Sequence, residues 1–123
     1  MSRVWAGRIL SAIPVLFVLM GAVIKLMKTP AVVQIFAQFG FQESLILVIG
    51  LIELGCVIVY LIPRTAVLGA ILMTALLGGA TVTNVRLNNP DWVVPVLLGV
   101  LVWGGLFLRD ERVRMLIPFR KLD

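Results

Sequence analysis

The chain contains no histidine and a single cysteine, Cys56. Without histidine it cannot hold haem or zinc through an imidazole, build a Ser-His triad or pass protons through a histidine. A lone cysteine also excludes an internal disulfide and a Cys-x-x-Cys redox pair. We therefore expect no catalytic residues, no metal site and no intrinsic cofactor in this sequence.

Charged residues are scarce as well. They make up 14% of the 123 residues, whereas 61% are apolar and the mean hydropathy is +1.11. Soluble domains are about 45–50% apolar and need a charged surface that this composition cannot provide. The composition therefore excludes a small soluble domain and indicates one integral membrane domain over residues 1–123. The net charge of +5 does not indicate nucleic-acid binding, because the charges lie at the ends of apolar runs.

Four apolar stretches approach the roughly 20 residues that a helix needs to cross the hydrocarbon core. They predict an all-α, integral membrane four-helix bundle with helices at about 5–27, 44–62, 65–87 and 92–109, followed by a basic cytoplasmic tail at 109–123. The connection Pro63-Arg64-Thr65 is so short that it predicts a helical hairpin. Small or hydroxylated residues on one face of the third helix indicate close helix packing: they are Ala66, Ala70, Thr74, Gly78 and Thr81.

The segment 30–40 has a different pattern. Pro30 suits the first turn of a helix, and Gly40 suits its end. Gln34, Gln38 and Gln42 recur every four residues and form one polar stripe beside an apolar face. The pattern predicts a short amphipathic helix between the first and second membrane helices. Two arrangements remain open: a helix at the membrane surface, and a linker helix packed over the bundle.

The basic residues are unevenly divided between the two sides of the predicted bundle. Four crossings put both termini on one side, which carries eight of the 11 basic residues: Arg3, Arg8, Arg64, Arg109, Arg112, Arg114, Arg120 and Lys121. The other side carries Lys25, Lys28 and Arg86. Because cytoplasmic segments are enriched in Lys and Arg, both termini are predicted to face the cytoplasm. Trp5, Tyr60 and Trp92 lie near the predicted interfaces, where amphipathic rings are favoured.

Glu53 is the only charged residue inside the stretch 44–63, and it lies near the middle of the predicted membrane helix. A carboxylate at this depth is costly, and it is a functional hypothesis by default. Gly50 shares its helical face and would let another backbone approach. The first helix carries a matching stripe that includes Gly21 and Lys25. Glu53 lies about 13 Å of helix rise from Ser44, and a lysine or arginine stem reaching inward could shorten that gap.

These polar residues predict a pocket that opens on the side opposite the termini. Its candidate ligand-binding residues are Lys25, Glu53, Thr81, Asn84 and Arg86. Glu53 would form the floor of the pocket, and the two cations would stand at its mouth. The alternative is structural: Glu53 pairs with Lys25, or accepts a hydrogen bond from Thr81 or Asn84, and so fixes the helix register. A proton-coupled transport carboxylate is the third alternative.

Several motifs in this order resemble the DoxX-like family of small bacterial membrane proteins. They are Gly21-Ala22-Val23-Ile24-Lys25-Leu26, Gly50-Leu51-Ile52-Glu53-Leu54-Gly55, Pro63-Arg64-Thr65, Gly78-Gly79-Ala80-Thr81-Val82-Thr83-Asn84-Val85-Arg86, and Leu108-Arg109-Asp110 with Pro118. The resemblance implies a compact four-helix membrane bundle, and it links some members to membrane oxidoreductase assemblies and quinone-linked sulfur oxidation. Relatives often carry His where this chain has Asn84. Any acid–base or metal role of that His is therefore lost here, whereas hydrogen bonding to a ligand is retained.

The resemblance and the predicted pocket together give a functional hypothesis. We expect a multi-pass protein of the bacterial inner (plasma) membrane that binds a lipophilic or quinone-like molecule as an accessory to a membrane redox system. The candidate bound molecules are a quinone or a lipid. The expected partners are membrane lipid and either a redox enzyme or further copies of this chain in a homo-oligomer, and no nucleic acid is expected. The alternatives are a proton-coupled small-molecule transporter and a structural assembly subunit without a ligand.

Overall fold

The computed structural model describes residues 2–120, and all regular secondary structure in this part of the chain is helical. Lys121, counted above with the basic tail, lies outside the described residues. The helices are α1 (Ser2–Met27), α2 (Pro30–Phe39), α3 (Ser44–Leu61), α4 (Ala66–Arg86), α5 (Val93–Arg109) and α6 (Glu111–Leu116). Two short 3₁₀ turns, η1 (Pro63–Thr65) and η2 (Pro90–Trp92), precede α4 and α5.

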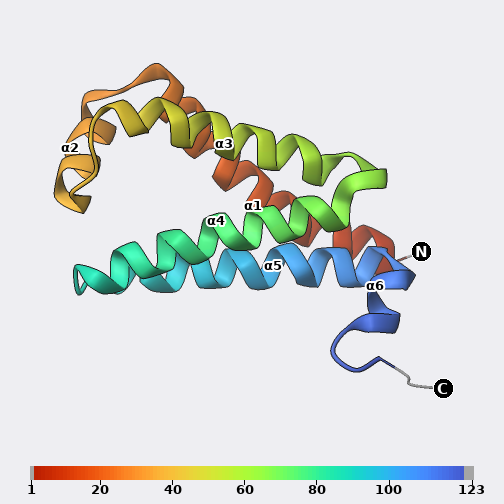
Figure 1. The fold of residues 1–123 in the computed structure, drawn as a ribbon. Helices are drawn as coiled ribbons and strands as arrows, with labels where there is room; N and C mark the ends of the chain where they lie inside the picture. Colours follow the sequence, from red (N-terminus) through yellow and green to blue (C-terminus); the bar gives the residue numbers. More distant parts are fainter. Residues whose placement is uncertain (1, 121–123) are drawn as a thin grey trace.

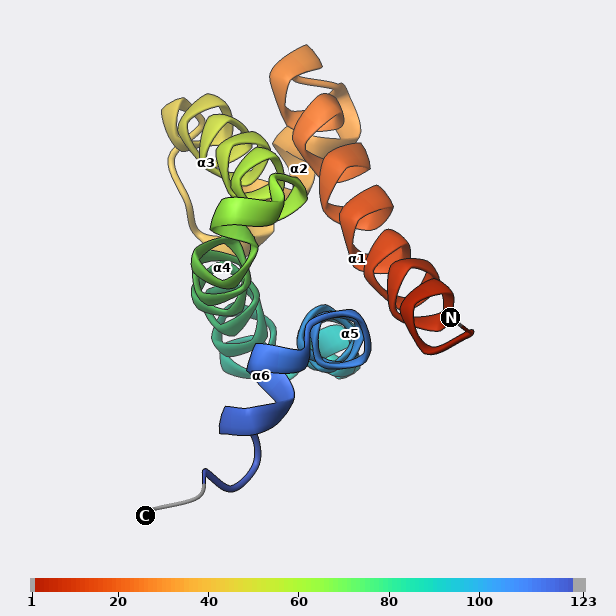
Figure 2. The same ribbon diagram turned by 90° about the vertical axis from the view of Figure 1, so that its right-hand side faces the viewer.

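The predicted fold class is confirmed. Four helical segments are long and apolar enough to cross a membrane: α1, α3, η1 with α4, and η2 with α5. Each long helix packs mainly on two others, with α1 and α4 both lying against α3 and α5 (Figure 2). The chain begins and α5 ends at one end of the bundle, whereas α2 lies at the opposite end (Figure 1).

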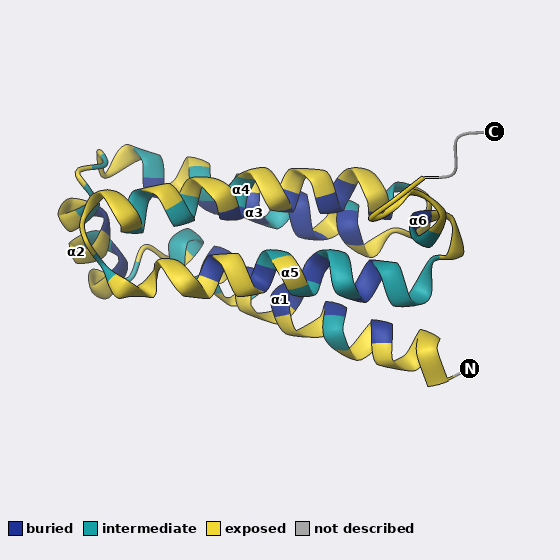
Figure 3. Ribbon diagram, turned by 90° about the horizontal axis from the view of Figure 1, so that it is seen from below, coloured by how far each residue is buried: buried dark blue, intermediate teal, exposed yellow. Residues whose placement is uncertain are grey.

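The outer faces of the long helices are apolar and exposed (Figure 3). Leu16, Leu51, Leu72 and Leu97 are examples, one on each of the four helices. A soluble protein of this size rarely exposes so continuous an apolar surface, but a lipid-facing surface requires one. The buried residues instead lie on the inward-facing side of each long helix (Figure 3).

The helices approach most closely in the half of the bundle near the termini. Gly7 of α1 faces Gly105 of α5, where an added Cβ at Gly7 would lie 2.6 Å from the Gly105 carbonyl oxygen. An added Cβ at Gly69 of α4 would overlap the Tyr60 backbone of α3. The small-residue stripe predicted for this helix is only partly the contact surface. Ala66 and Ala70 are buried, but a Cβ at Gly78 would meet nothing within 4 Å.

A chain of hydrogen bonds crosses this close-packed half. The Tyr60 hydroxyl donates to the Val102 carbonyl oxygen at 2.7 Å, and it accepts from the Ser11 hydroxyl at 2.9 Å. Ser11 in turn accepts from Arg109 Nε at 3.2 Å. Only 1% of the Tyr60 surface is exposed, so its ring packs inside the bundle and does not face lipid. Its ring is buried because its hydroxyl finds partners inside the bundle.

The Gly7–Gly105 contact predicts a difference between two neighbouring glycines. Gly105→Ala should lower the free energy of unfolding by about 1–3 kcal/mol, because its Cβ would collide with Ser11 and lie 2.8 Å from the Gly7 carbonyl oxygen. Gly104→Ala is the matched control, since its Cβ would meet nothing within 4 Å. Thermal unfolding of the purified protein in detergent measures both. Equal stability of the two variants would contradict the proposed contact.

Candidate functional site

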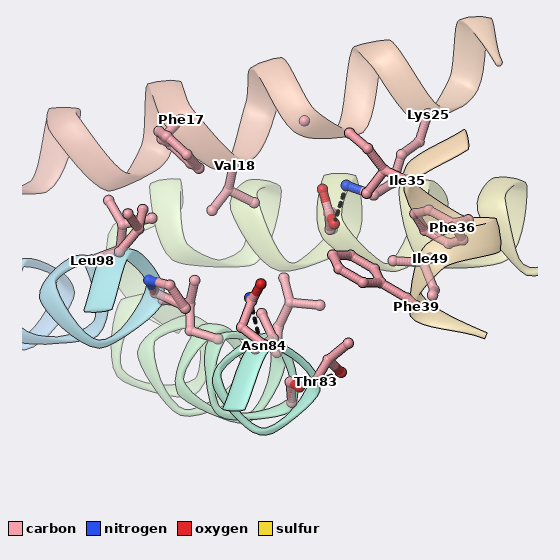
Figure 4. A pocket seen from close by; sticks show the side chains of 18 of the residues that line it. Phe17, Val18, Lys25, Ile35, Phe36, Phe39, Ile49, Thr83, Asn84 and Leu98 are labelled. Carbon is pink, nitrogen blue, oxygen red and sulfur yellow. Dashed lines mark hydrogen bonds and ion pairs between the residues drawn. The ribbon is translucent and has the colours of Figure 1, made fainter. Parts of the chain in front are cut away.

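A cavity of about 650 Å³ lies inside the half of the bundle that carries α2 (Figure 4). This volume falls within the range of about 300–1,000 Å³ that is usual for small-molecule sites. The lining comes from the C-terminal part of α1, the N-terminal part of α3, the C-terminal part of α4, the first turns of α5, and α2. Most of the lining side chains are apolar. The polar or charged ones are Lys25, Glu53, Thr83, Asn84 and Asp91.

Lys25 of α1 and Glu53 of α3 form an ion pair in the wall of this cavity. Lys25 Nζ lies 2.7 Å from Glu53 Oε1, and the two side chains are 17% and 11% exposed (Figure 4). The predicted reach of the lysine stem toward Glu53 is therefore confirmed. Such a pair is stable in an apolar medium only while both partners are present, because either charge alone would lack solvation.

Two glycines make room for this pair. A Cβ at Gly21 of α1 would lie 3.2 Å from Glu53 Oε2, and a Cβ at Gly50 of α3 would lie 3.0 Å from the Lys25 Cβ. Each helix thus presents a glycine to the charged side chain of the other. The face of α1 that carries Gly21 and Lys25 therefore packs against the face of α3 that carries Gly50 and Glu53. The pair and the glycines together set the register of α1 against α3.

Asn84 supplies an uncharged polar group on the opposite wall. It lines the cavity from α4 and points into it (Figure 4). Its Nδ2 donates to the Ala80 carbonyl oxygen at 2.8 Å, which leaves the side-chain oxygen outside this bond. Thr83, which the sequence did not single out as a site residue, also lines the cavity, and its hydroxyl donates to the Gly79 carbonyl oxygen at 2.8 Å. The cavity therefore has polar groups on three helices, α1, α3 and α4.

The predicted site residues thus divide into two groups. Lys25, Glu53 and Asn84 line the cavity, whereas Thr81 and Arg86 are not part of its lining. The Thr81 hydroxyl donates to the Leu77 carbonyl oxygen of its own helix at 2.8 Å. Arg86 donates from Nη2 to the Phe39 carbonyl oxygen at the end of α2. The electronegative C-terminus of α2 draws the guanidinium to this carbonyl.

Helix α2 covers the cavity with aromatic side chains, which the sequence did not reveal as a wall. Phe36 and Phe39 line the cavity (Figure 4). Phe41, in the linker that follows, lines it as well. The Phe36 and Phe41 rings lie 5.8 Å apart, and the Phe39 and Phe41 rings lie 6.2 Å apart. Val32 and Phe36, four residues apart on the apolar face, are the buried residues of this helix. Of the two arrangements left open by the sequence, their burial supports the linker helix packed over the bundle.

Local contacts define both ends of α2. Thr29 caps its N-terminus by accepting from the Val32 backbone N–H at 3.4 Å. Gly40 ends it in the left-handed conformation, with φ of 80°. Next to the two ends of this insertion, Lys28 Nζ lies 3.4 Å from Glu43 Oε1. The side chains of this second pair are 51% and 60% exposed, so the pair lies in solvent, whereas the Lys25–Glu53 pair is largely buried.

The site offers charge and hydrogen bonds, without a set of metal ligands. Within residues 2–120, no three side chains of His, Cys, Asp or Glu lie close enough together to hold a metal ion. Cys56 is buried one turn from Glu53 and does not line the cavity. The arrangement can hold a molecule with an apolar body, and it can hydrogen-bond a polar headgroup near the ion pair.

The two ion pairs predict two different responses to the loss of a carboxylate. Glu53→Gln should lower the free energy of unfolding by about 2–3 kcal/mol, because it leaves the Lys25 ammonium largely buried without its anion. Glu43→Gln should cost less than about 1 kcal/mol, because its pair is exposed. Thermal unfolding in detergent measures both, and the double variant Lys25→Met/Glu53→Leu should recover most of the loss. Equal losses in the two single variants would show that Glu53 is not held as described.

Comparison with known proteins gives one match. The DoxX-like family matches residues 9–105, which is most of the chain. No curated protein and no solved structure matches the chain. The matched range includes Lys25, Glu53 and Asn84, the whole of α3 and α4, and most of α1 and α5. The chain therefore belongs to the DoxX-like family of membrane proteins.

Proposed function

We propose that the protein binds a lipophilic, quinone-like molecule in the cavity beneath α2 and acts as an accessory to a membrane redox system. The observation that carries the proposal is the cavity itself, because its largely apolar wall contains a buried Lys–Glu pair and an amide. Ligand sites commonly combine an apolar wall with a few placed polar groups. The volume is sufficient for a ring and part of a tail.

The apolar and the polar parts of the cavity wall suggest how such a molecule lies in the cavity. Phe17, Phe36 and Leu98 would contact its apolar body from three different helices. The Lys25 ammonium carries three N–H donors, so it can bind a carbonyl oxygen while it remains paired with Glu53. Asn84 can donate to or accept from the other side of the headgroup. These residues would hold and orient the headgroup.

The redox part of the proposal assigns electron transfer to the ligand and to a partner enzyme. With no histidine and one buried cysteine, the chain's own contribution would be binding and positioning. The uneven distribution of basic residues supports a position in the inner membrane with both termini in the cytoplasm. The cavity lies at the end opposite the termini, so it would then open toward the outer face (Figure 1).

Binding of a short-tailed quinone tests this function directly. The wild-type protein in nanodiscs should bind a decyl-substituted quinone saturably, as measured by equilibrium dialysis. Lys25→Met should weaken binding by at least about tenfold, because a hydrogen bond from a charged group is lost. Ala80→Phe, which adds a ring to the cavity wall without breaking the ion pair, should abolish binding.

The control is the second lysine of the same region. Lys28→Met removes a lysine that is 51% exposed and does not line the cavity, and it should leave the dissociation constant unchanged. Protein-free nanodiscs measure partition of the quinone into lipid. If the wild-type protein retains no more quinone than these nanodiscs, the proposal is wrong. It is also wrong if Lys28→Met and Lys25→Met weaken binding equally.

A further inference from the structure

We infer that the cavity selects molecules whose headgroup carries no net charge. This inference rests on the function proposed above and narrows its ligand class. The occupant is a neutral amphiphile, with an apolar chain or ring system and an uncharged group that forms hydrogen bonds. The cavity binds anionic lipids and cationic amphiphiles of the same chain length more weakly than this neutral amphiphile.

The charge balance in the wall is the first argument. Lys25 Nζ and Glu53 Oε1 lie 2.7 Å apart and neutralise each other, and neither side chain is more than 17% exposed. An anionic headgroup that pairs with Lys25 would leave the Glu53 carboxylate without its cation. A cationic headgroup that pairs with Glu53 would leave the Lys25 ammonium without its anion. Either exchange places an unpaired charge in a poorly solvated position, which is strongly unfavourable.

The other charges near the cavity do not change this balance. Arg86, the remaining cation at this end of α4, donates to the Phe39 carbonyl oxygen and does not line the cavity. Asp91 does line it, but this residue is exposed on η2 at the end of the bundle. Solvent at that end screens its charge. The buried polar part of the wall is therefore neutral as a whole.

The rim of the cavity gives the second argument. Three of its exposed lining residues are apolar and come from three helices: Phe17 of α1 is 55% exposed, Ile35 of α2 is 44% exposed and Val94 of α5 is 39% exposed. A headgroup that passes these side chains leaves water before it reaches the ion pair. The free-energy cost of leaving water is far higher for a charged group than for a hydroxyl or a carbonyl.

A neutral headgroup avoids both costs and still finds partners. The Lys25 ammonium can donate to its oxygen through an N–H that is not used by Glu53. Glu53 Oε2 or the Asn84 side-chain oxygen can accept a hydrogen bond from a hydroxyl. The ion pair then stays intact while the ligand is bound.

A matched series of amphiphiles tests the inference. Dodecanol, dodecanesulfonate and dodecylammonium, each with the same photoreactive group in the chain, are added to the protein in phosphatidylcholine nanodiscs. Labelling of cavity peptides is measured by mass spectrometry and normalised to the labelling of the lipid-facing surface. In the wild-type protein, dodecanol should label the cavity at least about tenfold more than either ion.

Single variants of the pair should change this preference in opposite directions. Glu53→Gln leaves the Lys25 cation and should raise labelling by dodecanesulfonate. Lys25→Met leaves the Glu53 anion and should raise labelling by dodecylammonium. The matched variants of the exposed pair, Glu43→Gln and Lys28→Met, should keep the wild-type ranking. The exchanged pair Lys25→Glu/Glu53→Lys should also favour dodecanol, which keeps the test valid if a single variant fails to fold.

The possible outcomes separate this inference from the function on which it rests. If none of the three probes labels the cavity above the lipid-facing surface, both proposals fail. If the cavity is labelled but an ion equals or exceeds dodecanol in the wild-type protein, ligand binding stands and the selectivity is wrong. A preference for dodecylammonium that disappears in Asp91→Asn would assign the selectivity to Asp91 and would overturn the inference.

Discussion

An ammonium and a carboxylate that lie 2.7 Å apart inside an apolar bundle must stay together, because each would otherwise be a charge without solvation. This requirement fixes α1 against α3 at Lys25 and Glu53, and Gly21 and Gly50 provide the space for it. It also places polar groups in a wall that is otherwise apolar. The architecture of the site therefore follows from one electrostatic constraint, and the surrounding side chains give it shape.

The bundle divides into a close-packed half and an open half. Near the termini, glycines bring α1 against α5 and α3 against α4. The hydrogen bonds of Tyr60 with Ser11 and Val102 link α3 to α1 and α5 there. At the other end the helices enclose about 650 Å³, and α2 covers this space (Figures 1 and 4). The half near the termini is thus close-packed, whereas the half beneath α2 contains the cavity and the Lys25–Glu53 pair. A cavity in the half near the termini would remove contacts that hold the four helices together.

The number of membrane helices and the amphipathic segment could be predicted from the sequence, because hydrophobic runs and a four-residue polar repeat are local patterns. The pairing of Lys25 with Glu53 was also within reach, since a carboxylate in an apolar helix needs a partner. Position on α4 predicted Arg86 and Thr81 at the site, yet neither side chain lines the cavity, because each donates to a backbone carbonyl oxygen instead. The carbonyl that Arg86 binds belongs to α2, 47 residues away in sequence, so only the tertiary fold could reveal it. The aromatic wall and the Gly69–Tyr60 contact depend on tertiary packing in the same way.

The covering helix has a kinetic consequence. One side of the insertion is secured by the exposed Lys28–Glu43 pair, and its end by the exposed Arg86 side chain. Interactions between exposed charges weaken as dissolved ions accumulate around them, whereas the buried pair beneath is shielded from those ions. For the ligand proposed above, residence time would therefore depend on the exposed contacts of α2, and affinity would depend on the buried pair. Dissolved ions would then change how fast that ligand leaves the cavity, without changing which headgroup the buried pair accepts.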